Sequence, residues 1–401
     1  MSGHGKHQAL GGPVWTPAFK ILTWIFGISL VLWIWRFVAG LGATTGLTDA
    51  YPWGIWIAFD VVTGMALGCG GYAMAFLIYI FNKGQYHPLV RPALLTSALG
   101  YSIGALAINV DVGRTPYLYK IPFAWFWWNK HSVLLEVALC VMAYVTVLWI
   151  ELSPALFEKW EEGSVPLLKR LAEIFGPLFK KLNVVILALG MLLPTMHQSS
   201  LGALMVIGGQ KVHGLYQTPW MPFLFLVSCV CMGYAVVVFE SILAALSFKR
   251  PFETKLLSSI GKVNGWLILF YVALRAGDLI YRGKFGLAFQ FSLPMVMFWI
   301  EMILFTAGAL MLLVPGYSNR ISGQFNAAMA IIFAGIIYRL DTYLVAYNPG
   351  AGQHYFPTVP EMFITIGLIA LEIMAYLYFV KVFPIFASPE APASPRVRGE
   401  R

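Results

Sequence analysis

Eleven ionisable side chains lie within, or at the ends of, long apolar stretches of this chain. An unpaired charge at the centre of a membrane helix costs at least about 2.5 kcal/mol, so such groups usually form a functional pathway or a network of ion pairs. Carboxyl and imidazole groups can also take up and release protons during a reaction. The residues are Asp60, Asp111, Glu136, His197, Glu240, Arg275, Asp278, Glu301, Arg339, Asp341 and Glu372.

The segment LLPTMHQSS, residues 192–200, concentrates polar groups within one apolar stretch. Pro194 cannot donate a backbone hydrogen bond and frees a carbonyl, and the next turn supplies His197 and Gln198. A kinked, polar turn of this kind is a candidate ligand site. In the alternative interpretation, the serines satisfy the freed carbonyl and His197 is a structural core residue.

Glu136 is the carboxyl group best placed for proton exchange. It lies about five residues inside the stretch 132–152, which at about 1.5 Å per residue is roughly 7 to 8 Å below the interface. Ser132, on the same face, could supply a hydroxyl group or hold a water molecule. Tyr101, Asp111 and Arg114 belong to the preceding stretch, which is a candidate neighbour.

The composition excludes a soluble protein. Only 11% of the 401 residues are charged and 59% are hydrophobic, whereas soluble domains carry about 25% charged residues. The excess of apolar residues also excludes a disordered chain. A mean hydropathy of +0.74 therefore indicates that most of the chain is immersed in lipid.

Ten apolar stretches are long enough to cross a bilayer core of about 30 Å. None shows the alternation typical of a membrane barrel strand, so the predicted fold is an all-α polytopic membrane protein with about ten transmembrane helices. The first stretch should remain as an uncleaved anchor. The stretches are 19–41, 54–81, 89–110, 132–152, 184–207, 221–247, 263–281, 293–314, 323–346 and 361–384.

The distribution of basic residues predicts the orientation. Of the 27 Lys and Arg residues, 18 fall on the side of the amino terminus and 6 on the other side. Basic loops stay in the cytoplasm, so both termini should be cytoplasmic in a bacterial inner membrane. The net charge of +9 is then a topology signal, and nucleic-acid binding is unnecessary to explain it.

The alternating direction of the helices places most of the polar chemistry in the external half. Asp60, Asp111, Glu136, His197, Asp278 and Asp341 lie there, Glu301 and Glu372 lie nearer the middle, and Glu240 lies toward the cytoplasm. The set Glu240, Glu301, Glu372, Asp278 and Asp341 could form a proton path. Alternatively, Arg275 and Arg339 could pair with carboxylates across helices.

A weak internal repeat suggests how the helices are grouped. Asp111 precedes Glu136 by 25 residues, and Asp278 precedes Glu301 by 23, each pair spanning the end of one helix and the next helix. We therefore expect two parallel four-helix units, about 54–207 and 221–346, within a membrane domain of residues 19–384. Residues 1–18 and 385–401 are the expected cytoplasmic tails.

The loops differ between the two sides. On the cytoplasmic side, residues 153–183 place Leu168, Leu171, Phe175, Leu178 and Leu182 on one stripe and basic residues elsewhere. This pattern predicts a surface-lying amphipathic helix interrupted at Gly176 and Pro177. On the external side, the loops 45–54, 114–131, 208–222 and 348–357 are rich in Gly, Pro and aromatic residues. These loops form either an interfacial aromatic belt or a docking surface.

The chain lacks the ligand patterns of two kinds of redox protein, the membrane cytochromes with haem b and the metal or iron–sulfur proteins. A membrane haem b needs two facing histidines, and only His197 lies well inside a predicted helix. The four cysteines have no spacing typical of zinc or iron–sulfur ligation, so no metal site is expected.

Gly64 with Gly68, and Gly100 with Gly104, are GxxxG pairs that predict close helix packing.

Five motifs carry a resemblance to a known family. The chain resembles the polysulfide-reductase membrane-anchor family, also called the nitrite-reductase D type, in the branch that serves hydrogenases of the hydrogenase-2 kind. The FNKGQYHPLVRPALL and LLPTMHQSS blocks are the most specific, and the similarity extends over essentially the whole chain. The motifs are PWGIWIAFD (52–60), FNKGQYHPLVRPALL (81–95), NVDVGR (109–114), LLPTMHQSS (192–200) and AYNPG with YFPT (346–358).

The resemblance implies a redox role that the residues can serve. Members of this family hold no haem and exchange electrons between quinone and an iron–sulfur partner beneath a periplasmic head. The expected cofactor is menaquinone or ubiquinone, with no haem or iron–sulfur cluster in this chain. The expected partners are a ferredoxin-like iron–sulfur subunit, the small and large subunits of a nickel–iron (NiFe) uptake hydrogenase, and membrane lipid.

Quinone reduction moves two protons with two electrons, so its site needs acid–base groups. The residues expected to carry this chemistry are Glu136, His197, Asp60 and Asp111, and those expected to bind quinone are Tyr101, Arg114, Glu136, His197 and Gln198. The chain would not act on hydrogen itself. A proton-coupled transporter or proton channel built on the same carboxylates is the alternative function.

Overall fold

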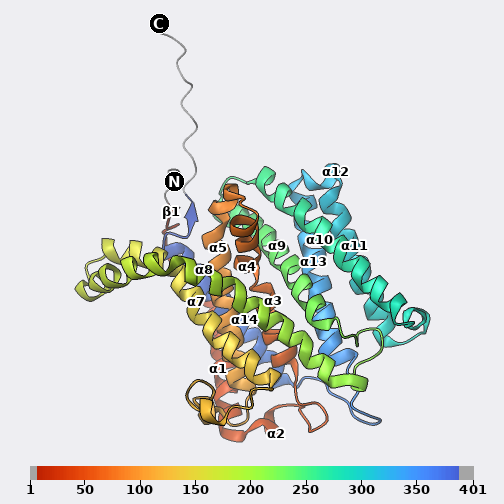
Figure 1. The fold of residues 1–401 in the computed structure, drawn as a ribbon. Coiled ribbons are helices and arrows are strands. Elements are labelled where there is room, and N and C mark those ends of the chain that lie inside the picture. Colours follow the sequence, from red (N-terminus) through yellow and green to blue (C-terminus); the bar gives the residue numbers. More distant parts are fainter. Residues whose placement is uncertain (1–6, 388–401) are drawn as a thin grey trace.

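The computed structural model describes residues 7–387 and is helical apart from two very short strands (Figure 1). Within these described residues, ten helices are long and apolar enough to cross a membrane, which confirms the predicted fold class. The spans consist of α1 (Pro17–Ala39), the broken helix from η1 (Trp56–Val61) through α3 (Gly64–Leu67) and α4 (Gly70–Ala75) to η2 (Phe76–Ile80), α5 (Val90–Asp111) with η3 (Gly84–Leu89), α7 (Val133–Glu162), α8 (Pro166–Gly208), α9 (Met221–Phe248), α10 (Thr254–Tyr281), α11 (Leu293–Leu313), α13 (Ile321–Leu340) with η8 (Asp341–Val345), and α14 (Val359–Val382).

Short elements connect these spans. They are α2 (Leu41–Thr44), η4 (Thr115–Tyr117), α6 (Lys120–Phe123), η5 (Trp125–Trp127), η6 (Gly209–Lys211), η7 (Phe285–Phe289) and α12 (Pro315–Ser318). Most predicted helix boundaries agree closely with the observed ones. Helices α7, α8 and α10 extend well beyond their apolar stretches, because hydropathy detects the lipid-facing part of a helix and not its polar continuation.

The polar segment 153–183 is helical, but its predicted interruption is wrong. The chain turns at Gly163, where α7 ends, and α8 starts at Pro166, whose missing N–H is harmless in a first turn. Helix α8 then continues through Pro177 without ending, since a helix can tolerate one lost backbone bond. The resulting α7–α8 hairpin projects from the side of the bundle (Figure 1).

The helices pack as two rings with a flanking pair. The broken helix η1–η2, α5, α7 and α8 pack in one ring, and α9, α10, α11 and α13 pack in another. The two rings meet where α9 contacts α3, α4 and α8, while α1 packs on α14 beside α5. The expected division into units 54–207 and 221–346, and their relation by an internal repeat, stay predictions.

Close packing at glycines positions the first ring. A Cβ atom on Gly100 would lie 3.3 Å from the Cα of Gly68, and one on Gly104 would clash with Met65. Both GxxxG pairs therefore bring α5 against the broken helix, as the sequence predicted. This approach sets the position of Tyr101, the residue next to Gly100.

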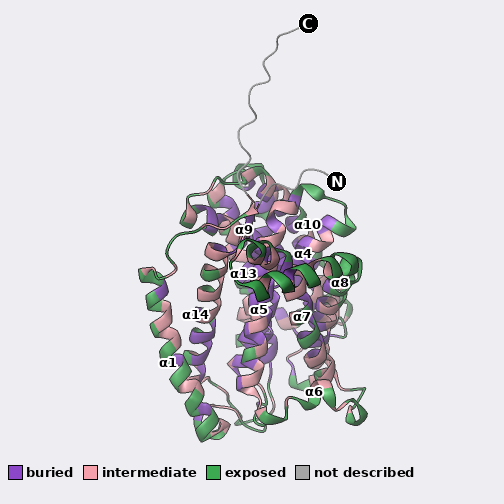
Figure 2. Cartoon of the chain, turned by 90° about the vertical axis from the view of Figure 1, so that its left-hand side faces the viewer, coloured by how far each residue is buried: buried purple, intermediate pink, exposed green. Residues whose placement is uncertain are grey.

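The two ends of the described chain meet on one face of the bundle. Strand β1 (His7–Gln8) pairs antiparallel with β2 (Phe386–Ala387), and we call this side the terminal face. The opposite side, formed by residues 40–55, 112–132, 209–220, 282–292 and 346–358, is the loop face (Figures 1 and 2). Residues 1–6 and 388–401 of the predicted tails lie outside the described residues.

Reporter fusions test the predicted orientation. A fusion after Arg401 or within 153–183 should report cytoplasm, and a fusion near Gln210 or Gly350 should report the external side, because basic loops resist export. Paired alkaline phosphatase and fluorescent protein fusions measure this directly. Phosphatase activity at the terminal face would reverse the orientation and every assignment of sidedness below.

Candidate functional site

A polar cluster lies at the centre of the first ring. The Tyr101 hydroxyl lies 3.4 Å from His197 Nδ1 and 3.5 Å from the Cys69 thiol, and Gln198 Nε2 donates to it at 3.3 Å. These four side chains are fully buried. His197 Nε2 has no partner among the described residues. Since buried polar atoms are normally hydrogen-bonded, this nitrogen is a candidate contact for a ligand or a water molecule.

Arg339 of α13 closes the cluster on the side of the second ring. Its guanidinium donates to Gln198 Oε1 at 3.4 Å and to Ser228 Oγ at 3.2 Å. It also donates to the backbone carbonyls of Val62 and Phe225. No described carboxylate lies within ion-pair distance, so this fully buried arginine places a positive charge beside Gln198 without a direct ion pair.

One face of α7 leads from the loop face to this cluster. Glu136, Cys140 and Tyr144 are spaced four residues apart and share that face. The Tyr144 ring packs edge-on against Tyr101 with centroids 4.5 Å apart. Glu136 itself is half-buried in the first turn of α7, and its carboxyl group makes no hydrogen bond among the described residues. Ser132, expected to assist it, instead caps the helix.

Asp111 and Arg114 lie away from the cluster. Tyr101 precedes Asp111 by ten residues of α5, or about 15 Å. One Asp111 carboxylate oxygen is buried without a partner, and nearby Arg36 of α1 binds the Val112 carbonyl at 2.8 Å. Arg114 is exposed in the following loop. Of the predicted quinone-binding residues, the structure thus brings together Tyr101, His197 and Gln198, but not Glu136 or Arg114.

A second polar row follows α14. Thr365 donates to Asp60 Oδ2 at 2.7 Å, and Tyr376 donates to Glu240 Oε1 at 2.6 Å. Glu372 lies between them on the same face of α14, within electrostatic range of both carboxylates. We call Asp60, Thr365, Glu372, Tyr376 and Glu240 the α14 seam. Thr365 and Tyr376 are eleven residues apart, so the seam extends about 16 Å along the helix.

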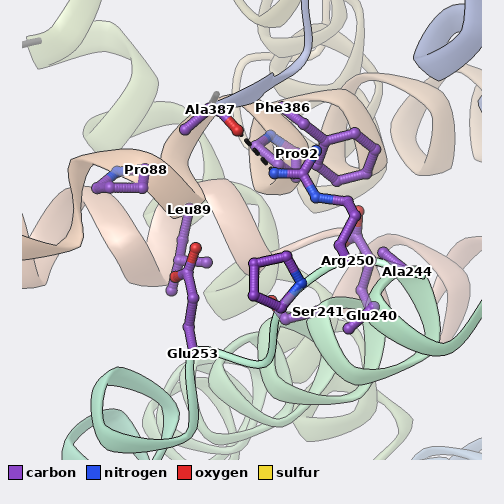
Figure 3. A pocket seen from close by; sticks show the side chains of 12 residues that line it. Pro88, Leu89, Pro92, Glu240, Ser241, Ala244, Arg250, Glu253, Phe386 and Ala387 are labelled. Carbon is purple, nitrogen blue, oxygen red and sulfur yellow. Dashed lines mark hydrogen bonds between the residues drawn. The ribbon is translucent and has the colours of Figure 1, made fainter. Parts of the chain in front are cut away.

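The α14 seam passes close to the central cluster and ends at a cavity. Glu372 Oε1 lies 3.3 Å from where a Cβ on Gly100 would be, so it packs against α5 next to Tyr101. At the other end, Glu240 lines a small cavity near the terminal face (Figure 3). Thr96 donates to the second Glu240 oxygen at 2.7 Å. Asp60, Glu372 and Glu240 therefore form one group, which contains two residues of the predicted proton path, Glu240 and Glu372.

The remaining members of that predicted path lie in the second ring. Arg275 pairs with Glu301 at 3.5 Å across α10 and α11, both side chains being fully buried. Tyr271 donates to the other Glu301 oxygen at 3.0 Å. Asp341 accepts a hydrogen bond from Tyr216 at 2.9 Å. Arg275 is thus partnered by a carboxylate on another helix. The place of Glu301 in a proton path stays a prediction.

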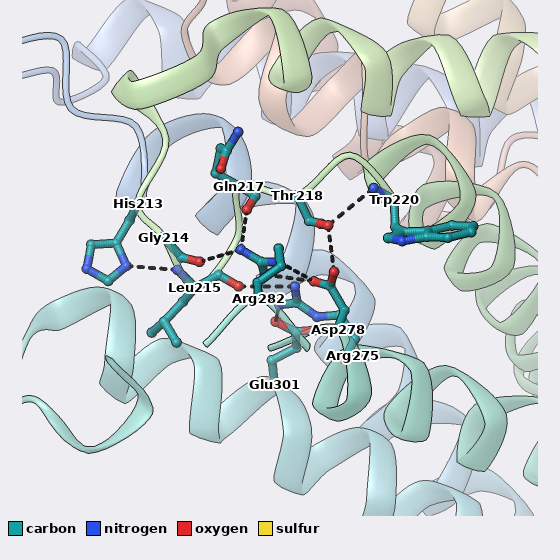
Figure 4. Close-up of polar contacts among 10 residues, drawn as sticks. All are labelled: His213, Gly214, Leu215, Gln217, Thr218, Trp220, Arg275, Asp278, Arg282 and Glu301. Carbon is teal, nitrogen blue, oxygen red and sulfur yellow. Dashed lines mark hydrogen bonds and ion pairs between the residues drawn. The ribbon is translucent and has the colours of Figure 1, made fainter. Parts of the chain in front are cut away.

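Asp278 lies at the loop face and has a structural role. Arg282 pairs with it at 2.7 Å and also binds the carbonyls of Gly214 and Gln217, while Thr218 donates to its other oxygen (Figure 4). Figure 4 shows these side chains clamping the loop after α8 onto α10. Asp278 is therefore separated from the α14 seam and linked to loop packing.

Comparison with known proteins identifies the family. Residues 43–348 match the family described as "Polysulphide reductase, NrfD", which covers more than half of the chain. The chain belongs to this family. It is accordingly a multi-pass integral membrane protein, and the family resemblance of its motifs is confirmed.

Three proteins from different organisms are similar to this NrfD-type chain over most of its length. It is 42% identical over 94% of both chains to the "Probable Ni/Fe-hydrogenase 2 b-type cytochrome subunit" of Escherichia coli (strain K12). It is 27% identical over 86% of both chains to the "Menaquinone reductase, integral membrane subunit" of Nitratidesulfovibrio vulgaris. It is 23% identical to the "Hdr-like menaquinol oxidoreductase integral membrane subunit" of Archaeoglobus fulgidus, over 85% of this chain and 86% of the relative.

The histidines of this NrfD-type chain do not fit a b-type haem, despite the name of the E. coli relative. A haem held by two histidines needs a pair facing each other at similar depth. His197 lies deep in a span, but its described neighbours are Tyr101 and Gln198, and the other histidines within residues 7–387 lie in strand β1, in loops or near span ends. Within residues 7–387, no group of three or more His, Cys, Asp or Glu could hold a metal ion.

Sequence reasoning missed several residues of these sites. Thr365 and Tyr376 are uncharged, and a polar hydroxyl in an apolar helix gives little signal until its partner is known. Glu151 was missed because it lies at the end of its apolar stretch, although it packs against Gly190 of α8. Arg339 was recognised as intramembrane, but its contact with Gln198 required the fold.

Proposed function

We propose that this chain is the quinone-reactive membrane anchor of a respiratory nickel–iron uptake hydrogenase. The observation that carries the proposal is the unpartnered Nε2 of buried His197 beside Tyr101 and Gln198. A quinone carbonyl accepts hydrogen bonds, and its reduction requires nearby proton donors. The 42% identical hydrogenase-2 relative supports the choice of hydrogenase, and the two relatives named for menaquinone chemistry support the choice of quinone.

Different residues would have different roles in quinone reduction. A quinone takes up two electrons from an iron–sulfur partner and two protons to become a quinol. His197 and Tyr101 would hold and protonate one carbonyl, and the Arg339 charge would stabilise negative charge developing on the ring. Glu136 stands at the loop-face end of the α7 row and would exchange protons with the outside.

The loop face suits docking of an electron donor. Phe126 is 75% exposed and Trp127 is 88% exposed in the loop between α5 and α7. Aromatic side chains of this kind are enriched in protein interfaces. We propose that this face contacts the ferredoxin-like iron–sulfur subunit, on the periplasmic side of the inner membrane, beneath the small and large hydrogenase subunits.

Glu136→Gln should separate assembly from quinone chemistry. The substitution keeps the shape of the side chain but cannot ionise, so hydrogen-to-quinone turnover should fall by roughly a hundredfold or more. Hydrogen oxidation with an artificial dye should be unchanged, and the iron–sulfur and nickel–iron subunits should co-purify. Glu173→Gln, an exposed carboxylate of α8, is the matched control. Normal quinone-linked turnover in the assembled Glu136→Gln complex would make this carboxylate structural.

A proton channel remains a second candidate because the α14 seam extends across much of the bundle. In proteoliposomes without hydrogen or quinone, a channel would dissipate an imposed pH gradient, and Glu372→Gln would abolish that leak. The anchor proposed above would instead hold the gradient until turnover begins. Purification of this chain alone, without iron or nickel subunits, would also favour the channel.

A further inference from the structure

A small cavity lies where the α14 seam approaches the terminal face. Its volume is about 40 Å³, enough for a few water molecules, since one needs roughly 10–15 Å³. Glu240 and Ser241 of α9 line it from within the membrane span, and Arg250 and Glu253 line it from beyond the end of that helix (Figure 3). Glu240 keeps partial exposure although it lies about two turns inside α9.

The carboxyl-terminal strand β2 covers this cavity. Arg250 Nη2 donates to the Ala387 carbonyl at 2.7 Å, and the guanidinium stacks over the Phe386 ring at 4.3 Å. Strand β2 is paired in turn with the two residues of β1. The cover is therefore a short segment held by Arg250, by its pairing with β1, and by the burial of Phe386, whose ring packs against Phe248.

Of the two charged groups at the mouth of the cavity, Glu253 is exposed and Arg250 is half-buried. Burial raises the pKa of the Glu253 carboxyl, and the neighbouring Arg250 opposes that shift. Burial also lowers the pKa of Arg250, while Glu253 acts in the opposite direction. A carboxyl group with a raised pKa releases and rebinds protons closer to neutral pH than an exposed one.

We propose that this cavity is the water-filled mouth through which the α14 seam exchanges protons at the terminal face. Glu253 is the entry carboxyl, Glu240 is the first group of the seam that it serves, and Arg250 is a positioning residue that holds β2 as the cover. The proposal rests on the proposed quinone chemistry and adds to it a second proton route, along the α14 seam to the terminal face. Its geometry is nevertheless testable without turnover.

Cysteine accessibility in the purified complex tests the mouth directly. A charged methanethiosulfonate reagent reacts only where water reaches, so Ala244→Cys, which lines the cavity, should be modified. Adding Arg250→Gln should release β2 and speed that modification roughly tenfold or more. Leu243→Cys, the lipid-facing neighbour, should react slowly and be unaffected by Arg250→Gln. An Ala244→Cys thiol that stays unreactive in both backgrounds overturns the proposal.

A substitution that fills the cavity tests whether the cavity serves proton transfer. Ala244→Phe should fill the cavity and lower quinone-linked hydrogen oxidation at least tenfold, with dye-linked oxidation intact, whereas Leu243→Phe should preserve both activities. Normal quinone-linked turnover in an assembled Ala244→Phe complex would overturn the proton-exchange role of the cavity, even if the Ala244→Cys thiol is reactive. Failure of the proposed function gives a different result. The unmodified complex would then show no quinone-linked turnover, while the Ala244→Cys thiol would still be modified as expected.

Discussion

His197→Asn is expected to lower quinone-linked hydrogen oxidation by roughly a hundredfold or more while dye-linked oxidation stays unchanged. Asparagine can place a polar atom near the position of Nδ1 and so keep the contact with Tyr101, which is 3.4 Å away in the structure. It has no atom at the position of Nε2, the nitrogen without a described partner. The variant therefore removes the proposed quinone contact with little disturbance of the cluster.

Two further variants act as controls for this result. His197→Gln can reach toward the Nε2 position, so it should lose less activity than His197→Asn. Tyr144→Phe removes a hydroxyl that makes no hydrogen bond among the described side chains but keeps the ring contact with Tyr101, and should be close to normal. Equal turnover in the asparagine variant and the unmodified complex would remove His197 from the quinone site.

Glu301→Gln is expected to destabilise the protein by about 3–5 kcal/mol, because it leaves Arg275 buried without its counter-charge. Both side chains are completely buried, and Arg275 also binds the Leu215 carbonyl in the loop after α8. The measurement is the midpoint of thermal unfolding in detergent, followed by loss of the monodisperse complex. Yield from membranes should fall with the midpoint.

The double variant Arg275→Leu/Glu301→Leu distinguishes stability from proton transfer. Replacing a buried ion pair by apolar residues is often neutral or stabilising, so much of the lost stability should return. If Glu301 is structural, quinone-linked turnover should return with it. A Glu301→Gln protein of normal stability that lacks quinone-linked turnover would instead place Glu301 in the proton path.

Much of the fold was predictable from the sequence because lipid imposes a simple requirement on it. A helix satisfies its backbone internally, so ten long apolar stretches indicate ten spans. The ends of α7, α8 and α10 were less predictable, since their polar continuations leave the apolar stretch. Pro177 was expected to interrupt a helix, but the packing of α8 against α7 maintains it.

The candidate site was predictable only in part. His197 and Gln198 stood out as polar residues in an apolar turn, and the structure places both beside Tyr101. The partners of charged residues required tertiary contacts: Arg275 lies three residues from Asp278 in sequence, yet it pairs with Glu301. The grouping of Asp60 with Glu240 likewise depends on α14, which follows both of them in the chain by more than a hundred residues.

Photolabelling with an azido-quinone tests the central claim most directly. The hydrogenase complex, in membranes depleted of native quinone, would be labelled and its peptides mapped by mass spectrometry. Labelling is predicted on α5 near Tyr101 and on α8 near His197, reduced by excess quinone and by His197→Asn. Quinone-protected labelling confined to α10 and α11, around Arg275 and Glu301, would contradict the assignment of the quinone site to the first ring.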